Sequence, residues 1–392
     1  MNTLNALGSS NKVKVIMKIG IFGGSFDPVH NEHVNMAMMA KEELQLDRLY
    51  IIPAKISPFK RARKVTSSKD RLAMLNLAFL DKDVVISEYE LSKVGVSYTC
   101  DTILQFRKFF PKDKLYFIMG GDSIASFKKW KNPEVIAKNA EIAVIARGGN
   151  YVSLKNEEKE FKKHFGKNFI KLNYVGKEVS ATKIRLLSLF GLPLDGYVPK
   201  AVEDYIKEHS LYKDNPYMNY LKEVMTESRL IHTANVVTVA LSKAEQEGLD
   251  SNKVLLTAVL HDIAKNIDPD TVEGFTYKGI PKQVVHAYLG AYIMETKLGI
   301  TDTEVLNAVR YHTTATVPMS KLAKLIFCAD MVEEDRTYEG VERLREIFHT
   351  KDIDTAFKEC LKEEIEHLKQ KGYELFGETK NAYEYYIKYN NV

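Results

Sequence analysis

A regular alternation of strand-like and helix-like segments runs through the first half of this 392-residue chain and stops near residue 212. The strand-like segments are short apolar or β-branched runs, and helical patterns such as Arg71–Phe79 and Tyr98–Phe109 lie between them. Alternation of this kind is typical of a doubly wound α/β domain, in which helices cover both faces of a parallel sheet. Its active site is expected at the carboxyl ends of the strands. The predicted strands are Lys18–Phe22, Arg48–Pro53, Val84–Ser87, Leu115–Met119, Glu141–Ala146 and Phe169–Tyr174.

The rest of the chain reads as one helix after another, with few β-branched runs. A polar, helix-breaking stretch at 213–216 separates the two patterns. A chain of this length exceeds what one hydrophobic core usually organises, so we predict a second, all-α domain. We place an N-terminal extension at 1–16, the α/β domain at 17–212, a linker at 213–217 and the helical domain at 218–392. The predicted helices of that domain are Met218–Glu247, Ser251–Ala264, Pro281–Lys297, Thr303–His312, Ser320–Met331, Val341–Thr350 and Asp354–Lys371.

Composition excludes several classes of protein. The 56 basic and 52 acidic residues nearly balance, which argues against nucleic-acid binding, although seven basic residues gather between Lys55 and Arg71. Such a cluster is more often a solvated loop than a phosphate site. Cys100, Cys328 and Cys360 form no CxxC pair, which favours a reducing cytoplasm over a disulfide framework or a zinc finger. No apolar run of about 18 residues is present, so neither a signal peptide nor a membrane span is expected.

The turn between the first predicted strand and the helix predicted at His33–Leu44 is rich in groups that bind phosphate. Gly23 and Gly24 allow the backbone to approach a ligand closely, and the amides at the start of the helix can hold anionic oxygens. The imidazoles of His30 and His33 can donate hydrogen bonds to charge that develops on a phosphoryl group. A lone histidine here would more often be structural, but two histidines in one turn favour a catalytic role.

On these residues, the stretch 17–212 resembles the nucleotidyltransferases with an HxGH signature, and specifically the nicotinate-nucleotide adenylyltransferases. The run from Gly23 to His30 is similar to the opening motif of that family, and Val179–Arg185 is similar to its second, SxTxIR-type motif. A hydroxyl-rich helix start followed by an arginine one turn later is a good phosphate clamp, although Ser180 could be only an N-cap and Arg185 only a surface residue. The resemblance assigns ATP binding to Gly23, Gly24, Ser25, Phe26, Lys60, Ser180, Thr182 and Arg185, and catalysis to His30 and His33.

Two middle segments, Ser97–Thr102 and Phe117–Asp122, resemble the nicotinate-mononucleotide pocket of the same family. Trp130 is the only tryptophan, and its indole face could stack on a pyridine ring, although a place in the core is equally compatible with the sequence. Donors near Tyr98 and Thr99 could hold the nicotinate carboxylate. A pantetheine phosphate or an alcohol phosphate remains the alternative acceptor. The acceptor-side residues that the resemblance implies are Tyr98, Thr99, Gly120, Asp122, which could orient ribose or a metal, and Trp130.

The sequence departs from the family pattern at two positions. Glu32 stands where HxGH has glycine, and Phe59 stands where a histidine is usual. A carboxylate at position 32 would crowd or repel an incoming nucleotide unless it turns outward. The resemblance otherwise implies ATP, Mg²⁺ and nicotinate mononucleotide as partners, with attack of the 5′-phosphate on the α-phosphorus and release of pyrophosphate.

The helical half carries histidines and aspartates within apolar helical segments. Buried imidazoles and carboxylates are costly without partners, so a shared metal would satisfy them together. Nitrogen and oxygen donors without thiolate suit iron, manganese or other first-row ions. The predicted ligands are His232, His261, Asp262, His286, His312 and Asp330.

Their order resembles the HD superfamily of metal phosphohydrolases over about Tyr217–Lys388, and the surrounding segments resemble the bacterial HD hydrolases that cleave diadenosine tetraphosphate to two ADP. The resemblance implies two ions that share Asp262, with His286 and His312 as the added ligands unless they are ordinary core or surface residues. It also gives Asp262 and Lys265 catalytic roles and Arg336 a phosphate-binding role. An interaction with a helix dipole is the alternative for Lys265.

Several alternatives stay open for the second domain. It could hydrolyse another nucleotide, such as a nucleoside monophosphate or an alarmone, or it could be a metal-binding regulatory module without catalysis. The partners expected for the whole chain are ATP, nicotinate mononucleotide and a dinucleoside polyphosphate. Neither nucleic acid nor a membrane is expected, and a homo-oligomer is compatible with the sequence.

Overall fold

The computed structural model describes residues 16–55, 65–93, 95–147, 154–177, 179–213 and 216–389. The N-terminal extension predicted at 1–16 lies outside these ranges except for Ile16, and so does Lys60. The chain separates into two compact units. The first contains Met1–Ala181 and Leu194–Leu211, and the second contains Thr182–Pro193 and Tyr212–Val392.

The first unit is built on one parallel sheet with the strand order β3-β2-β1-β4-β5-β6. This confirms the predicted doubly wound sheet. The chain leaves β1 towards β2 and later returns to β4 on the other side of β1, so the order reverses between β1 and β4. Ligands of such sheets bind outside the carboxyl ends of the strands at this switch point. The strands are β1 (Lys18–Gly24), β2 (Arg48–Pro53), β3 (Val85–Ile86), β4 (Lys114–Gly120), β5 (Glu141–Arg147) and β6 (Ile170–Gly176).

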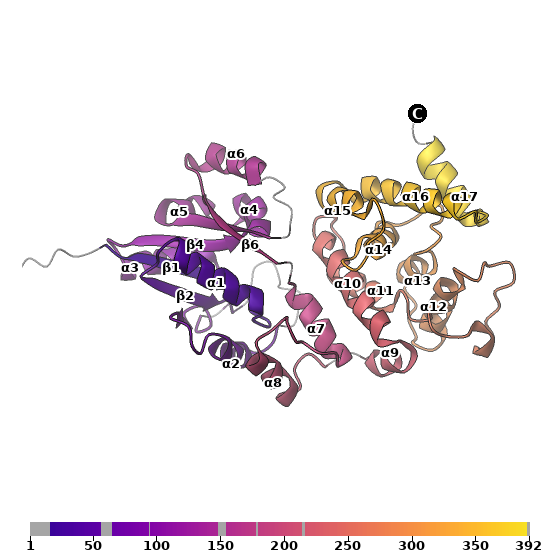
Figure 1. Cartoon of the computed structure of the whole chain (residues 1–392), viewed down its shortest axis with the longest axis horizontal. Coiled ribbons are helices and arrows are strands. Elements are labelled where there is room, and N and C mark those ends of the chain that lie inside the picture. Colours follow the sequence, from indigo (N-terminus) through magenta and orange to yellow (C-terminus); the bar gives the residue numbers. More distant parts are fainter. Residues whose placement is uncertain are drawn as a thin grey trace, which may run out of the picture. The chain divides into compact units, whose positions relative to one another are not determined.

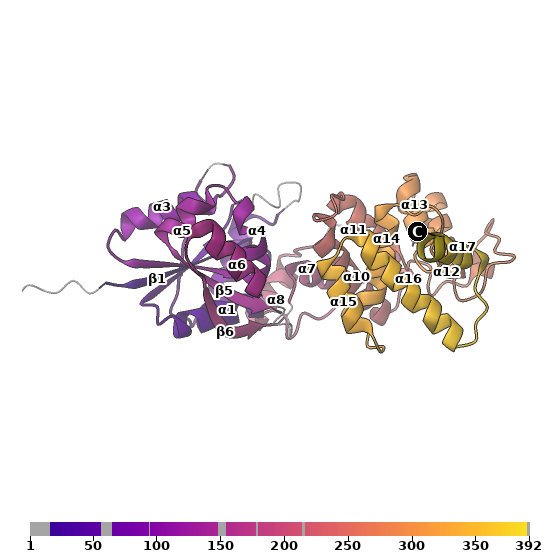
Figure 2. The same ribbon diagram turned by 90° about the horizontal axis from the view of Figure 1, so that it is seen from above.

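Helices cover both faces of this sheet (Figures 1 and 2). On one face, apolar residues of the strands pack against α3, α5 and α6 in a single buried cluster that includes Ile21, Phe117 and Phe161. On the other face, α1 packs against β2 and β6. Gly20 is required on that face, because a Cβ there would lie 2.4 Å from Leu46 Cδ1. The helices of this unit are α1 (Asn31–Glu43), α2 (Ser68–Ala78), α3 (Thr99–Phe109), α4 (Gly121–Ser126), η2 (Phe127–Lys129), α5 (Pro133–Asn139), α6 (Leu154–Phe165) and α8 (Lys200–Glu208).

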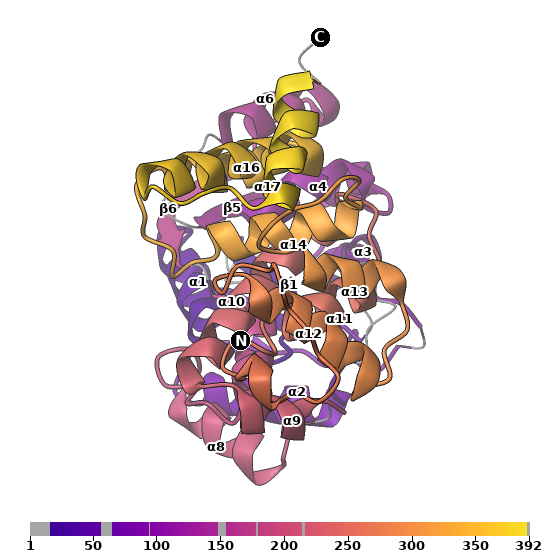
Figure 3. The same cartoon turned by 90° about the vertical axis from the view of Figure 1, so that its right-hand side faces the viewer.

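The second unit is helical, as the sequence predicts. In it, α10 packs against α11 and α14, and α13 packs against α12 and α14 (Figure 3). Almost all of α7, from Thr182 onward, also belongs to this unit. The helices are α7 (Ala181–Phe190), α9 (Met218–Val224), α10 (Glu227–Ala244), α11 (Ser251–Leu260), η3 (Pro269–Thr271), α12 (Val285–Thr296), α13 (Thr303–Arg310), α14 (Lys321–Val332), α15 (Val341–Thr350), α16 (Ile353–Gln370), α17 (Gly377–Tyr383) and the π-helix η4 (Glu384–Tyr389).

The single helix predicted at Met218–Glu247 is wrong, because the chain breaks between α9 and α10. Thr226 has an extended backbone, and its hydroxyl accepts a hydrogen bond from the amide of Arg229 at 3.3 Å, which makes it the N-cap of a new helix. Similarly, α11 ends at Leu260 and not at Ala264, so that residues 261–266 lie in turns. His232 thus lies within α10, and His261 is the C-cap of α11. Among the described residues, no helix is long and apolar enough to cross a membrane.

Candidate functional sites

In the first unit, the two histidines of the predicted phosphate-binding turn cap the helix that follows β1. His30 is the N-cap of α1, and its Nδ1 accepts a hydrogen bond from the amide of His33 at 3.2 Å. The Nδ1 of His33 accepts in return from the amide of His30 at 3.3 Å. The two rings stack with their centroids 3.5 Å apart.

This reciprocal arrangement determines which ring nitrogens can act on a ligand. Because the Nδ1 of each histidine accepts a backbone hydrogen bond, the neutral form of each ring carries its proton on Nε2. The Nε2 atoms are therefore the donors that a phosphate would meet. Phe26 supports this geometry, since its ring packs edge-on against His33 at 5.0 Å while its backbone adopts a left-handed φ of 47°.

Glu32 is directed away from this pair of histidines. Its side chain is buried and accepts a hydrogen bond from the hydroxyl of Tyr174 on β6. A Cβ on Gly176 would lie 2.6 Å from Glu32 Oε1, so the carboxylate occupies space that the glycine leaves open. The carboxylate is thus buried against β6.

The residues predicted for the acceptor side lie in β4, at the start of α3 and after η2, and the side chain of Asp122 is outside the described residues. Tyr98 and Trp130 both pack against the buried cluster under α3 and α5. The ammonium group of Lys131 lies 4.1 Å from the centre of the Tyr98 ring. The indole nitrogen of Trp130 donates a hydrogen bond to Ser126 Oγ at 3.4 Å. The side chain of Trp130 is half-buried and is part of the packing. Gly120 ends β4 at the predicted edge, and Thr99 begins α3.

The second phosphate-binding motif spans the boundary between the units. Ser180 belongs to the first unit, whereas Thr182 and Arg185 on α7 belong to the second. The guanidinium group of Arg185 donates to Thr182 Oγ1 at 2.8 Å, so these two residues of the predicted clamp do face each other. The structure does not gather both motifs within one unit.

In the second unit, all six predicted metal ligands converge. Asp262 lies between two groups of histidines: its Oδ2 is 3.8 Å from His232 Nε2 and 3.7 Å from His261 Nε2. Its Oδ1 is 3.3 Å from His286 Nε2 and 3.4 Å from His312 Nε2. The ligand atoms form three overlapping groups, namely His232 with His261 and Asp262, His261 with His312 and Asp330, and Asp262 with His286 and His312.

In three of the four histidines, Nδ1 faces an oxygen acceptor. His261 Nδ1 lies 2.8 Å from the carbonyl oxygen of Ala258, and His312 Nδ1 lies 2.7 Å from that of Val309. His232 Nδ1 lies 3.2 Å from the carboxylate of Glu333. A metal-binding histidine ordinarily donates its second ring N–H in this way, which leaves Nε2 for the ion.

Unsatisfied polar atoms test whether this cluster fits a metal. Asp262 Oδ1 and His312 Nε2 are buried without a hydrogen-bond partner among the described residues. Such atoms are costly unless something else binds them. A cation between the two would satisfy both, and the donor set of imidazole nitrogens and carboxylate oxygens suits first-row transition ions. The residues therefore fit a metal centre.

The protonation states also suit a metal. Burial lowers the pKa of His261 to about 4 and also lowers the pKa of His286, so both rings are neutral near pH 7. Burial opposes ionisation of Asp262, but the facing histidines outweigh it and hold its pKa well below the usual range. For His232, burial is outweighed by Asp330 and Glu333, which raise its pKa to about 9. A metal bound there would displace this proton.

Three cationic side chains surround the ligands. Arg229 Nη1 lies 2.5 Å from Asp262 Oδ2, and Arg336 Nη2 lies 2.6 Å from Asp330 Oδ1. Lys265 Nζ lies 3.0 Å from His286 Nε2, in the turn after α11 and not within a helix. Lys265 and Arg336 were predicted. Arg229 and Glu333 were not, and no local signal marks them, since their partners Asp262 and His232 lie 33 and 101 residues away.

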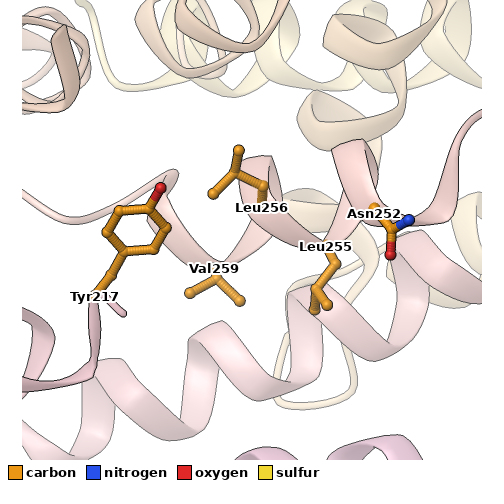
Figure 4. Close-up of a pocket in the computed structure, with 5 residues that line it drawn as sticks. All are labelled: Tyr217, Asn252, Leu255, Leu256 and Val259. Atoms are coloured by element: carbon orange, nitrogen blue, oxygen red, sulfur yellow. The ribbon is translucent and has the colours of Figure 1, made fainter. Parts of the chain in front are cut away.

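A pocket lies beside α11 (Figure 4). The positions of Asn252, Leu255, Leu256 and Val259 follow helical spacing along one side of α11, and Tyr217 completes the lining. Val254, Thr257 and Ala258 face the interior on the other side. No titratable group of the cluster lines the pocket, so we assign it no part in the chemistry.

The comparisons with known proteins identify both units. Residues 21–187 match the family model described as cytidylyltransferase-like, and residues 229–335 match the HD domain. The chain is thus a nucleotidyltransferase-type domain followed by an HD domain. It is 35% identical over 198 residues to a probable nicotinate-nucleotide adenylyltransferase of Clostridium tetani, an alignment that covers 50% of this chain and 99% of that protein. The chain belongs to the nicotinate-nucleotide adenylyltransferase family.

A second relative spans both domains. The chain is 28% identical over 332 residues to a Mycoplasma genitalium protein named probable nicotinate-nucleotide adenylyltransferase/Ap4A hydrolase, an alignment that covers 82% of this chain and 89% of that protein. A crystal structure from Clostridium acetobutylicum, described as a predicted HD superfamily hydrolase involved in NAD metabolism, is 28% identical and has a TM-score of 0.39. It covers 43% of this chain and 94% of that chain.

Proposed function

We propose that the chain is a bifunctional enzyme. The N-terminal domain transfers AMP from ATP to nicotinate mononucleotide, giving deamido-NAD and pyrophosphate. The C-terminal domain hydrolyses a dinucleoside polyphosphate, with diadenosine tetraphosphate and water giving two ADP. Family membership and the relative that carries both domains support the pairing. The observation that carries the proposal is the presence of two separate phosphate-directed clusters, His30 with His33 and the six ligands around Asp262.

In the transferase reaction, an oxygen of the acceptor 5′-phosphate forms a bond to the α-phosphorus of ATP, and the bond to the β-phosphate oxygen breaks. The backbone at Gly23 and Gly24 and the amides at the start of α1 bind the phosphates. The Nε2–H groups of His30 and His33 donate to the oxygens on which charge accumulates. Charge on the leaving pyrophosphate is also offset by Mg²⁺ that enters with ATP. No side chain forms a covalent intermediate.

On the acceptor side, we propose that Tyr98, Thr99 and Trp130 bind the nicotinate ring and its carboxylate, with Gly120 and Asp122 beside the ribose. Lys131, which lies over the Tyr98 ring, adds positive charge to the same region. For Ser180, Thr182 and Arg185, phosphate binding stays a prediction from the sequence motif. Cytidylyltransferase-like similarity runs to residue 187, so we keep 17–212 as the transferase domain, with α7 included, and 218–392 as the hydrolase domain after the linker at 213–217.

In the hydrolase domain, His232, His261, Asp330 and Oδ2 of Asp262 would hold one ion, and His286, His312 and Oδ1 of Asp262 would hold the other. Two iron or manganese ions would supply an activated water molecule and offset the charge of the phosphates. The cationic side chains would bind the polyphosphate. Arg229 is well placed for this, because its guanidinium group pairs with Asp262 and is partly exposed. Lys265 and Arg336 flank the same centre.

Product analysis tests both halves in one protein. The purified full-length chain is incubated with ATP, nicotinate mononucleotide and Mg²⁺, and separately with diadenosine tetraphosphate and Mn²⁺ or Fe²⁺. We expect deamido-NAD from the first mixture and ADP from the second. His33→Ala should abolish only the first reaction and Asp262→Asn only the second, so that each variant serves as the folding control for the other.

Other outcomes would assign the second domain differently. If it forms products other than ADP, or hydrolyses only a nucleoside monophosphate or an alarmone, its substrate is another nucleotide. Metal binding without hydrolysis would make it a regulatory module.

A further inference from the structure

Arg71 in α2 is fully buried, with 1% of its surface exposed. It belongs to the basic cluster that the sequence left open as a solvated loop or a phosphate-facing site, and its burial excludes the solvated loop for this residue. Its guanidinium group donates four hydrogen bonds to backbone carbonyl oxygens. Nη1 donates to Ser25 and Ala54, each at 2.7 Å, Nη2 donates to Lys55 at 3.3 Å, and Nε donates to Thr66 at 3.1 Å.

The acceptors come from three different segments of the chain. Ser25 lies in the phosphate-binding turn after β1, Ala54 and Lys55 follow the carboxyl end of β2, and Thr66 precedes α2. A buried guanidinium group is unfavourable unless its donors are satisfied, and an apolar side chain at this position would leave the same carbonyl groups without donors. Arg71 therefore joins three loops at the catalytic edge of the sheet into one rigid body.

The contact with Ser25 reaches the catalytic histidines. It fixes the carbonyl group of the residue before Phe26, whose left-handed backbone is unfavourable for a bulky side chain and must be held in place. Phe26 in turn packs against His33, and His33 and His30 cap each other. The position of both histidines thus depends on a peptide group that Arg71 anchors.

The contacts of Arg71 with Ala54 and Lys55, which follow β2, connect it with the acceptor side. The amide of Ala54 donates to the carbonyl oxygen of Gly24 at 2.9 Å, and the amide of Lys55 donates to Ser97 Oγ at 3.1 Å. Ser97 directly precedes Tyr98 and Thr99, the residues proposed to bind nicotinate. Through Lys55, Arg71 is therefore connected to the acceptor side of the site as well as to the ATP side.

We infer that Arg71 is a positioning residue that holds the ATP-binding turn in register with the acceptor-binding segment. This inference rests on the proposed transferase function. Reactants held slightly out of line lose rate much more than affinity, and a displacement of about 1 Å can cost about 100-fold. Loss of the Arg71 contacts should therefore lower kcat more than it raises either KM.

The test compares Arg71→Lys and Arg71→Gln with Arg107→Lys in the full-length chain. Arg107 is a matched control, because it also donates to backbone carbonyl groups, those of Phe110, Asp113 and Asn139. These acceptors lie near the amino ends of β4 and β5, at the edge opposite to the site. We expect Arg71→Lys to lower kcat for deamido-NAD formation by about 10- to 100-fold with KM changed by less than about threefold. Arg107→Lys should lower thermal stability without this loss of kcat.

Amide hydrogen exchange gives a second result that does not depend on activity. Faster exchange across 25–33 and 97–99 in Arg71→Lys, but not in Arg107→Lys, is expected. If Arg71→Lys keeps its kcat, or loses stability without faster exchange in those segments, Arg71 is only a structural residue and the inference is overturned. If the wild-type chain makes no deamido-NAD, the proposed function fails, and the exchange result alone then decides whether Arg71 orders the two segments. Should Arg71→Lys not fold, Arg71→Gln, whose side-chain amide keeps N–H donors, carries the same comparison.

Discussion

The hydroxyl group of Tyr174 donates a hydrogen bond to the carboxylate of Glu32, with oxygen–oxygen distances of 3.0 and 3.2 Å to its two oxygens. Burial and the nearby carboxylate raise the pKa of Tyr174 to about 12, so the hydroxyl stays a donor across the physiological range. Glu32 stands where the HxGH pattern has glycine, and β6 compensates through Tyr174 and through the open space at Gly176. The substitution is thus accommodated by the opposing strand.

This arrangement makes Gly176 intolerant of a side chain. Gly176→Ala would place a Cβ 2.6 Å from Glu32 Oε1, so either β6 or the carboxylate must move. We expect the free energy of unfolding to fall by about 1–3 kcal/mol, as is usual for overpacking. Transferase activity should fall as well, because Glu32 lies between His30 and His33 in the chain. Urea denaturation and deamido-NAD formation would measure the two effects.

The double variant Glu32→Ala/Gly176→Ala should be less destabilised than the sum of the two single variants, because removal of the carboxylate removes the clash. Gly377→Ala is the control, since a Cβ there meets nothing within 4 Å. Strict additivity of the two single variants would show that Glu32 and Gly176 do not interact.

The sheet could be predicted from the sequence because the four central strands β2, β1, β4 and β5 are largely buried and read as apolar runs bounded by turn residues. The break between α9 and α10 could not be predicted in the same way. The apolar pattern continues from Leu221 to Leu230, and only the capping geometry of Thr226 interrupts the helix. Likewise, the burial of Arg71 depends on carbonyl groups from distant segments, which no local pattern of basic residues reveals.

The metal ligands were predictable as a set, because their residue types are unusual within apolar helices. Their neighbours were not. Arg229 pairs with Asp262, 33 residues away, and Glu333 pairs with His232, 101 residues away. Arginine and glutamate are ordinary on helix surfaces and loops, so only the packing of α10 against α11 and α14 distinguishes these two from solvated charges.

The burial of Glu90 predicts that the stability of the fold depends on pH. Its buried carboxylate accepts a hydrogen bond from the hydroxyl of Thr102 at 2.5 Å, but burial has the larger effect and raises its pKa above the usual 4.5. Because the folded pKa lies above the unfolded one, the stability that this group contributes is present in full below pH 4.5 and is lost as the pH rises through the folded pKa. Glu90→Gln should therefore unfold at nearly the wild-type temperature near pH 4.5 and at a higher temperature at pH 7.5.

Thermal unfolding between these pH values checks this prediction, with the exposed Glu88→Gln as the control. A difference between Glu90→Gln and the wild type that stays constant with pH would contradict it, because a constant difference cannot come from ionisation.

We predict that the metal affinity depends on Glu333, although this residue is not itself a ligand. It lies 3.2 Å from His232 Nδ1, accepts from Asn235 Nδ2 at 3.0 Å, and so fixes the orientation of the His232 ring. Glu333→Ala should weaken binding of Mn²⁺ by about 10- to 100-fold, and Glu333→Gln, which keeps an acceptor oxygen, should weaken it less. Isothermal titration calorimetry measures the affinities directly. Glu339→Ala, an exposed change in the same loop, should leave them unaltered. Equal affinities in Glu333→Ala and the wild type would mean that packing alone orients His232.

The placement of the two oxygens of Asp262 predicts how many ions the HD domain binds. Its two oxygens face different histidines, Oδ2 towards His232 and His261 and Oδ1 towards His286 and His312. If each oxygen serves one ion, His286→Ala should lose the ion on the Oδ1 side and keep the other, whereas Asp262→Asn should weaken both. After removal of metal with a chelator and reloading with Mn²⁺, elemental analysis should give about two ions per wild-type chain and about one for His286→Ala.

Hydrolysis of diadenosine tetraphosphate should fall at least about 100-fold in Asp262→Asn, because both ions lose a shared ligand. His367→Ala serves as the control, since that histidine lies outside the described metal groups. A content of one ion in the wild type, unchanged in His286→Ala, would rule out the bridging role of Asp262 and leave a single ion on the Oδ2 side.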